Sequence, residues 1–228
     1  RPREVKSGIM NPFKLTTRLK LDALRSPHWM RSLLRNGIPK FTSLAPYMEP
    51  GVSIAEAAAF IRRESGGAFT WDEIARYRDK WRKPLVLKGV MHPEDAARAV
   101  ELGIDGLFVT NHGGRQIDAL PAPLDVLPAI AAAVGDKAEL IYDSGVRSGV
   151  DAARAVALGA DAAFVGKAFL WSLGALGEKG PAHLIDVLID DVSATLGQLG
   201  CRNVDELRNI AVRHPGAYAA VDFSGRSS

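Results

Sequence analysis

The residues with the clearest chemical potential are an imidazole and a guanidinium in one short run, residues 111–116, Asn-His-Gly-Gly-Arg-Gln. The apolar residues 107–109 before it are typical of a buried strand, and the glycines indicate a turn at its carboxyl end. Imidazole can transfer a proton near neutral pH. A guanidinium can hold a carboxylate through two parallel hydrogen bonds. His112 and Arg115 together therefore predict an enzyme that acts on a small organic acid.

The composition narrows the class of protein further. A length of 228 residues with 47% hydrophobic content suits one domain with an ample core. The formal net charge is only +3 and the Lys and Arg residues are spread along the chain, so we predict no nucleic-acid partner. The single cysteine, Cys201, excludes an internal disulfide framework and fits a reducing compartment. No apolar run approaches the roughly 20 residues of a membrane span, so we expect a cytoplasmic protein with at most peripheral association at the inner face of the membrane.

Strand and helix patterns alternate from about Thr70 onward. Thr70 and Glu73 form a capping box for one helix, while Pro93 opens another and Gly103 ends it. Because the expected strands are apolar along their whole length, we predict an α/β fold whose parallel sheet is buried on both faces. The expected strands are 84–89, 105–110, 139–143 and 162–166, and the helices between them are 123–134 and 149–158.

An internal repeat relates residues 95–109 to residues 151–165. Both segments carry Asp-Ala-Ala-Arg-Ala-Val, then Leu-Gly, an aspartate and Phe-Val, at a constant offset of 56 residues. This offset is about twice the length of a strand–helix unit, so each repeat would hold two units. A (β/α)₈ barrel built by duplication would show such a repeat, whereas a doubly wound sheet seldom does. Two independently Ala-rich amphipathic helices are the alternative.

Four strand–helix units are visible, and a TIM (β/α)₈ barrel needs eight. Residues 1–40 carry scattered basic residues and prolines without a clear strand, and residues 41–67 mix a short Ala-rich helix with Gly and Ser. We therefore predict that residues 70–228 form the carboxyl-terminal half of a barrel, strands 5–8 with C-terminal helices. Residues 1–69 are expected to be a long mobile loop that follows strand 4.

In a parallel barrel, functional side chains gather at the carboxyl ends of the strands. At the predicted strand ends lie Lys88 and the segments 110–115, 143–147 and 166–167. The last two segments are glycine-containing turns that lead into helices, and amides at a helix start bind phosphate. With Arg147 and Lys167 nearby, we expect a phosphorylated cofactor or substrate. No metal site is predicted.

Four motifs give the chain a resemblance to a known family. They are residues 87–90 (Leu-Lys-Gly-Val), 110–116 (Thr-Asn-His-Gly-Gly-Arg-Gln), 143–147 (Asp-Ser-Gly-Val-Arg) and 165–167 (Val-Gly-Lys). In order and spacing they resemble the carboxyl-terminal half of the FMN-dependent L-2-hydroxy acid oxidases and dehydrogenases. This family includes glycolate oxidase, L-lactate and mandelate dehydrogenases and the flavin domain of flavocytochrome b2. The resemblance covers residues 71–222, and residues 1–4 are similar to a basic motif that follows the fourth strand in these enzymes.

The resemblance implies FMN as the cofactor and assigns roles to residues. His112 would be the active-site base, Arg115 would bind the substrate carboxylate, and Lys88 would lie against N1 and the C2 carbonyl of the flavin. An ammonium there would stabilise the anion of reduced flavin. Arg3 would line the substrate pocket. The remaining implied cofactor contacts are His112 and Ser144, Thr110 to the flavin ring, Asp143 to the ribityl hydroxyls, and Gly145, Arg147, Gly166 and Lys167 at the phosphate.

The implied reaction is oxidation of a small L-2-hydroxy acid, such as lactate, glycolate or mandelate, to the 2-keto acid. Oxygen, a quinone or a cytochrome would accept the electrons, and a homo-oligomer, a tetramer or larger, is expected. Two departures stand out: Lys167 replaces the usual arginine, and the family's active-site tyrosines and histidine-orienting aspartate have no match here. Another FMN- or phosphate-binding barrel enzyme, such as a type 2 isopentenyl diphosphate isomerase or an inosine monophosphate dehydrogenase relative, and an inactive half-barrel, are the alternatives.

Overall fold

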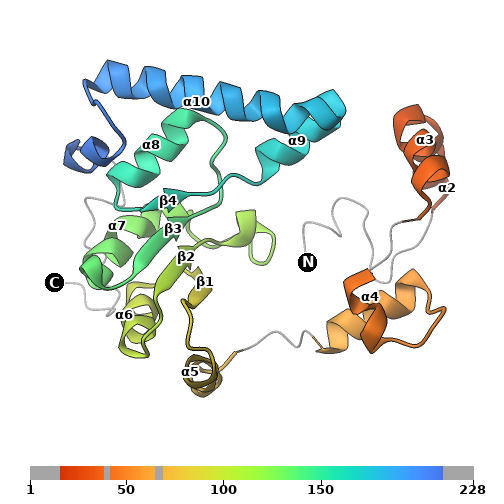
Figure 1. Cartoon of the computed structure of the whole chain (residues 1–228), viewed down its shortest axis with the longest axis horizontal. Coiled ribbons are helices and arrows are strands. Elements are labelled where there is room, and N and C mark those ends of the chain that lie inside the picture. The colour runs from red at the N-terminus through yellow and green to blue at the C-terminus, as the bar shows by residue number, and fades with distance from the viewer. Residues whose placement is uncertain (1–15, 39–41, 65–68, 213–228) are drawn as a thin grey trace. The chain divides into compact units, whose positions relative to one another are not determined.

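The computed structural model describes residues 16–38, 42–64 and 69–212 (Figure 1). The chain divides into two compact units, residues 1–69 and residues 70–228. Arg3, which the sequence places at the substrate, lies outside the described residues.

The described part of the first unit is helical. Its elements are α2 (Thr17–Leu24), α3 (Pro27–Asn36), the 3₁₀ helix η1 (Thr42–Tyr47) and α4 (Ile54–Glu64). The sequence analysis expected a loop here with one short Ala-rich helix, which corresponds to α4. Helices α2 and α3 were not expected, although the apolar residues 29, 30, 33 and 34 of α3 follow the period of a helix. The boundaries of α3 are also encoded locally, by Pro27 in the first turn and by Gly37, whose N–H donates to the Leu33 carbonyl.

The second unit alternates helices and strands. Its capping residues are those expected: Thr70 and Glu73 form the predicted capping box of the first helix, and His92 caps the helix that Pro93 opens. The elements in chain order are α5 (Trp71–Lys80), β1 (Val86–Val90), α6 (Pro93–Glu101), β2 (Gly106–Val109), η2 (His112–Gly114), α7 (Pro123–Val134), η3 (Gly135–Lys137), β3 (Glu139–Tyr142), α8 (Gly149–Ala157), β4 (Ala162–Ala163), α9 (Lys167–Leu176), η4 (Gly177–Lys179), α10 (Gly180–Leu199) and η5 (Asp205–Asn209).

The four strands form one parallel sheet in the order β1-β2-β3-β4, so the predicted parallel α/β sheet is confirmed. Leu87 pairs with Leu107, and Leu107 with Leu140, which sets the register across three strands. The last strand is shorter than the predicted 162–166: its register with β3 ends at Ala163, and one further hydrogen bond joins the Phe164 N–H to the Tyr142 carbonyl. Four parallel strands are consistent with part of a barrel, but the half-barrel itself stays a prediction.

The main hydrophobic core lies between the sheet and the helices α6, α7 and α8. Leu107 and Val109 from β2 meet Leu127 and Ile130 from α7, and all four side chains are fully buried. Alternate strand residues point the other way and are less covered, with Phe164 after β4 50% exposed. The expectation that the strands are buried on both faces is therefore wrong for the described part of the chain. An apolar strand sequence indicates that both faces of the sheet are apolar, but it does not indicate that another element covers each face.

Helix α10 adds an outer layer against α8 and α9. The contact is close at Gly149, the first residue of α8, where a Cβ atom would lie 2.4 Å from the Val192 backbone nitrogen. The Gly149 N–H donates to Asp191 Oδ2 at 2.6 Å. A glycine is therefore required at this position for α8 to begin against α10.

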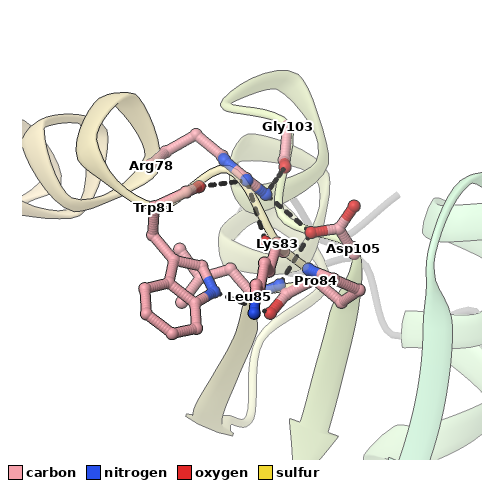
Figure 2. Close-up of polar contacts among 7 residues, drawn as sticks. All are labelled: Arg78, Trp81, Lys83, Pro84, Leu85, Gly103 and Asp105. Atoms are coloured by element: carbon pink, nitrogen blue, oxygen red, sulfur yellow. Dashed lines mark hydrogen bonds and ion pairs between the residues drawn. The ribbon is translucent and has the colours of Figure 1, made fainter.

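At the amino ends of the strands, Asp105 ties β1 to β2 (Figure 2). Its Oδ2 accepts the Leu85 N–H at 2.7 Å and pairs with Arg78 Nη1 at 2.6 Å. The Leu85 N–H, and after it the Arg78 guanidinium, lower the pKa of Asp105 from its usual value. The Arg78 guanidinium also donates to the carbonyls of Gly103, Trp81 and Lys83. These bonds hold the end of α5 against the turns that precede β1 and β2.

The internal repeat builds the same tie a second time. Asp161, offset from Asp105 by the repeat length, accepts the Leu140 N–H at 2.6 Å and pairs with Arg208 Nη2 at 2.6 Å. The two repeats therefore share a structural function at the start of β2 and of β4. This geometry favours the duplication over two unrelated Ala-rich helices.

Candidate active site

The parallel strands bring the predicted site residues to one edge of the sheet. A cavity of about 300 Å³ lies at the carboxyl ends of the strands. Eight of the predicted site residues line it, together with Gly113, Val146 and Leu170; they are His112, Arg115, Asp143, Ser144, Gly145, Arg147, Gly166 and Lys167. Thr110 and Lys88 do not belong to its lining.

Thr110 lies beneath this cavity and organises two turns. Its side chain is the one buried polar side chain among the described residues, at 2% exposure. Thr110 Oγ1 accepts the His112 N–H at 3.0 Å, donates to Asp143 Oδ2 at 3.1 Å, and lies 2.9 Å from Ser144 Oγ. The turn after β2 is therefore joined to the turn after β3 through one hydroxyl group.

His112 begins the short helix η2 in a left-handed conformation, with φ of 59°. Asn111 stabilises this turn: its Oδ1 accepts the Gly114 N–H at 3.0 Å and its Nδ2 donates to the Pro121 carbonyl at 3.1 Å. Gln116 Nε2 lies 3.4 Å from His112 Nδ1 and orients the ring. Sequence analysis did not assign Gln116 this contact, although its spacing of four residues from His112 was a usable signal.

Backbone strain concentrates at this edge. His112 and Ser144 are the non-glycine residues with positive φ in the described chain, at 59° and 89°. Such conformations persist only where the surrounding contacts hold them, and they cluster at functional sites. Here the Tyr142 hydroxyl donates to the Ser144 carbonyl at 2.8 Å. Burial raises the pKa of Tyr142 to about 12, so this phenol remains a donor throughout the physiological range.

The same cavity also has the features of an anion site at the start of α9. Helix α9 begins at Gly166 with no side-chain cap and no proline in its first turn. In the same unit, α5, α6 and α8 have side-chain caps, and α7 and α10 begin with proline. The first amides of α9 therefore remain available to a bound anion.

Two cationic side chains lie beside the start of α9. A Cβ atom on Gly113 would be 3.0 Å from Lys167 Nζ, so the ammonium reaches the turn that holds His112. The Arg147 guanidinium lies over the Trp171 ring, 5.6 Å from its centroid. These residues and the uncapped amides fit a phosphate group such as that of FMN, which makes the predicted cofactor compatible with the site.

Lys88 lies apart from the cavity lining, on the less covered face of the sheet. Its Nζ is 4.9 Å from the centroid of the Phe108 ring. Phe108 in turn meets Phe164 edge to face, with 5.0 Å between ring centroids. A planar ligand that reached both the cavity and Lys88 would extend across these aromatic rings, but the contact of Lys88 with a flavin stays a prediction.

Comparison with known proteins agrees with this geometry. Residues 1–214 match the family model described as FMN-dependent dehydrogenase. The L-lactate dehydrogenase of Bartonella tribocorum is 36% identical over 208 residues, which are 91% of this chain and 54% of that protein. The chain therefore spans about half the length of the curated relatives it matches.

Solved structures give the same result. The crystal structure of the monotopic membrane protein (S)-mandelate dehydrogenase superposes with a TM-score of 0.80 at 34% identity, over 91% of this chain and 54% of that one. Mandelate oxidase with (S)-4-hydroxymandelic acid has a TM-score of 0.60 at 40% identity, over 64% of this chain and 41% of its own. FMN is the cofactor of the matched family, as its name states. From its sequence, its parallel sheet and its site, the chain belongs to the family of FMN-dependent dehydrogenases.

Proposed function

We propose that the protein catalyses the FMN-dependent oxidation of a small L-2-hydroxy acid to the corresponding 2-keto acid. One observation carries the proposal: a single cavity is lined by His112 and Arg115 and also by Arg147 and Lys167 beside the uncapped start of α9. The first pair suits a hydroxy acid and the second suits the phosphate of the cofactor. The relatives named above as L-lactate dehydrogenase and mandelate oxidase support this substrate class.

The residues divide the chemistry between them. Bound FMN supplies the acceptor for the two electrons that leave the substrate. His112 accepts the proton, either from the hydroxyl group as hydride leaves the carbon, or from the carbon itself. Arg115 holds the substrate carboxylate and so fixes the distance from the reacting carbon to the imidazole. Lys88 would supply a positive charge beside the flavin ring, which would stabilise the negative charge of the reduced cofactor.

We also propose that β1 to β4 correspond to strands 5–8 of a barrel. The supporting observations are the exposed apolar side chains on one face of the sheet, such as Phe164, and the unpaired outer edges of β1 and β4 among the described strands. The remaining walls of the flavin pocket would then come from four further strands. Residues 1–228 alone are expected to bind FMN weakly and to show no turnover, because the flavin ring would lack one wall. Stoichiometric FMN and full turnover in a monomeric preparation of these residues would overturn this proposal.

The function is tested with the natural polypeptide that carries these residues. Arg147→Ala removes a charge-assisted contact with phosphate, and FMN affinity should fall by about 10- to 100-fold, measured by quenching of flavin fluorescence. Arg202→Ala is the matched control, since this arginine pairs with Glu206 away from the cavity. Activity is then measured with L-lactate and (S)-mandelate and an artificial electron acceptor. Absence of both FMN binding and turnover would overturn the proposal in favour of an inactive barrel part.

A membrane location is proposed on separate grounds. Among the described residues, no helix is long and apolar enough to cross a membrane. Helix α3 instead exposes Leu34 at 83% and Trp29 at 54%, beside Arg31 and Arg35. Such a helix suits the surface of an anionic bilayer, and a relative described as monotopic agrees with this interpretation. Co-sedimentation with anionic vesicles should be lost in Leu34→Asp, while zwitterionic vesicles should bind weakly; equal binding by the variant would exclude α3.

The electron acceptor and the assembly state follow the same family expectation. Oxygen, a quinone or a cytochrome would reoxidise the flavin. A homo-oligomer would cover part of the apolar surface of α9 and α10, where Leu170 is 69% and Ile189 57% exposed. Light scattering of the purified protein measures its mass and so tests whether it assembles.

A further inference from the structure

We propose that Ser144 is a positioning residue whose hydroxyl holds the backbone of the turn that carries His112. The inference rests on the proposed role of His112 as the base. It assigns Ser144 a function toward the histidine, distinct from the contact with the cofactor that the family resemblance implies. The proposal begins from two hydroxyl groups and two backbone amides that converge at the carboxyl ends of β2 and β3.

The contacts reach the two peptide groups that flank His112. Ser144 Oγ accepts the Gly113 N–H at 2.9 Å, and Thr110 Oγ1 accepts the His112 N–H at 3.0 Å. The two hydroxyl oxygens lie 2.9 Å apart. The consecutive N–H groups of His112 and Gly113 therefore donate to two hydroxyl groups that are hydrogen-bonded to each other.

The number of available protons fixes the direction of this network. The Asp143 carboxylate can only accept, so the hydroxyl of Thr110 donates its single proton to Asp143 Oδ2. The hydroxyl of Ser144 must then donate to Thr110 Oγ1, and its own oxygen accepts from Gly113. The donors run in one direction, from Gly113 through Ser144 and Thr110 to the charged group of Asp143. Hydrogen bonds in such a chain polarise and strengthen one another.

The backbone of Ser144 makes the role of its hydroxyl specific. At φ of 89° a glycine would be unstrained, whereas serine is strained. The turn itself has other supports, because the Ser144 N–H donates to Asp143 Oδ1 at 2.6 Å and the Ser144 carbonyl accepts from Tyr142. The hydroxyl contributes instead to the neighbouring turn, where His112 has its own positive φ. A serine at position 144 therefore strains its own backbone, but its hydroxyl group restricts the backbone of the turn that carries His112.

The decisive variant is Ser144→Gly, because it removes the hydroxyl and relieves the strain together. The midpoint of thermal unfolding should stay the same or rise. Hydrogen exchange of the backbone segment 111–114, followed by mass spectrometry without added flavin, should become about 5- to 10-fold faster, the loss expected for one net hydrogen bond. In the active enzyme, kcat should fall by about 10-fold or more with little change in KM, because the base is misplaced rather than the substrate.

Three comparisons complete the experiment. Ser148→Ala is the matched control: Ser148 Oγ caps α8 by accepting the Asp151 N–H at 3.2 Å, so this variant should lower the unfolding midpoint and leave exchange in 111–114 unchanged. Thr110→Ser keeps the second hydroxyl and should preserve slow exchange. Thr110→Val removes it and should reproduce the fast exchange of Ser144→Gly.

Each result bears on the proposal. Unchanged exchange in Ser144→Gly would overturn it, and so would a drop in its unfolding midpoint as large as that of Ser148→Ala. Fast exchange with unchanged kcat would overturn the positioning role while leaving the network in place. If the wild-type enzyme neither binds FMN nor turns over, the proposed function fails, and the exchange measurements still decide whether Ser144 holds the turn.

Discussion

The two ends of the strands are built on different principles. At the amino ends, the internal repeat uses one arrangement twice: Asp105 and Asp161 each accept an amide of the preceding strand and pair with an arginine. At the carboxyl ends, equivalent positions of the repeat differ, since Thr110 corresponds to Gly166 and His112 to Ala168. The two copies of the repeat therefore have the same residues where an aspartate joins neighbouring strands, and different residues where the strands end at the cavity.

The strain is distributed in the same way. The positive φ values of non-glycine residues occur at His112 and Ser144, both at the carboxyl ends. At the amino ends, positive φ values among the described residues are confined to glycines such as Gly103 and Gly159, and ion pairs of Asp105 and Asp161 join the segments. The amino ends of the strands therefore stabilise the sheet, and the strained backbone conformations at its carboxyl ends are tolerated because the sheet beneath them is stable. Substitutions at the carboxyl ends should therefore lower the catalytic rate, whereas substitutions at the amino ends should lower the free energy of unfolding.

The largest expected effect is at the carboxyl ends. His112→Gln should lower turnover by about 10²–10⁴-fold, because a general base is lost, and leave FMN affinity nearly unchanged. Steady-state kinetics and flavin titration of the complete enzyme measure the two quantities. His183→Gln on the exposed side of α10 is the control and should behave as wild type. Residual turnover above about a tenth of wild type would remove His112 from the role of base.

Arg115→Lys should lower kcat/KM by about 10- to 100-fold, since an ammonium cannot reproduce the two-pronged grip on a carboxylate. The loss should appear with a 2-hydroxy acid and be absent with its ester, which offers no carboxylate. An equal loss with both substrates, together with a lower unfolding midpoint, would mean that Arg115 only supports the turn.

A variant at the amino ends should have the opposite signature. Asp161→Ala leaves the N–H of the buried Leu140 without its acceptor and Arg208 without its partner, so we expect a loss of about 1–3 kcal/mol in the free energy of unfolding. Urea denaturation measures this loss, and Asp190→Ala on the exposed side of α10 is the control. Per folded molecule, FMN affinity should not change; a large change would break the division between the two edges.

The smallest effect concerns pH. Because hydrogen bonding lowers the pKa of Asp105 in the folded protein, the stability it contributes is complete above the usual value of 3.8 and is lost as pH falls through the lowered value. The unfolding midpoint of wild type should therefore drop more steeply in acid than that of Asp105→Asn. Asp136→Asn, at an exposed site in η3, should retain the wild-type slope. If the unfolding midpoint fell equally steeply with acid in all three proteins, the lowered pKa of Asp105 would be contradicted.

Much of the second unit could be predicted because its signals are local. The capping box at Thr70, the proline at the start of α6, and α7 over residues 123–134 all depend on residues within one turn of each other. Parallel pairing then follows from apolar strands alternating with helices. The same reasoning placed eight predicted residues around one cavity, because carboxyl ends of parallel strands share an edge.

Other features were not readable from the sequence for physical reasons. Ser144 and Gly113 meet across 31 positions of the chain, and no periodicity encodes such a hydrogen bond. The raised pKa of Tyr142 likewise depends on packing. The roles of Lys88 and the phosphate-binding residues toward FMN, and of His112 and Arg115 toward the substrate, remain predictions.

The order of the sheet has a consequence for how the chain folds. Every strand pairs with the strand next to it in sequence, and the aspartate ties span only 20 and 21 residues. Closing such short loops costs little chain entropy, so parallel pairing, which is usually slow, becomes a series of local steps. The pairs β1–β2 and β3–β4 can each be joined at their amino ends as soon as the second strand of the pair is available. The carboxyl-end turns would then acquire their strained conformations last, on a sheet already assembled.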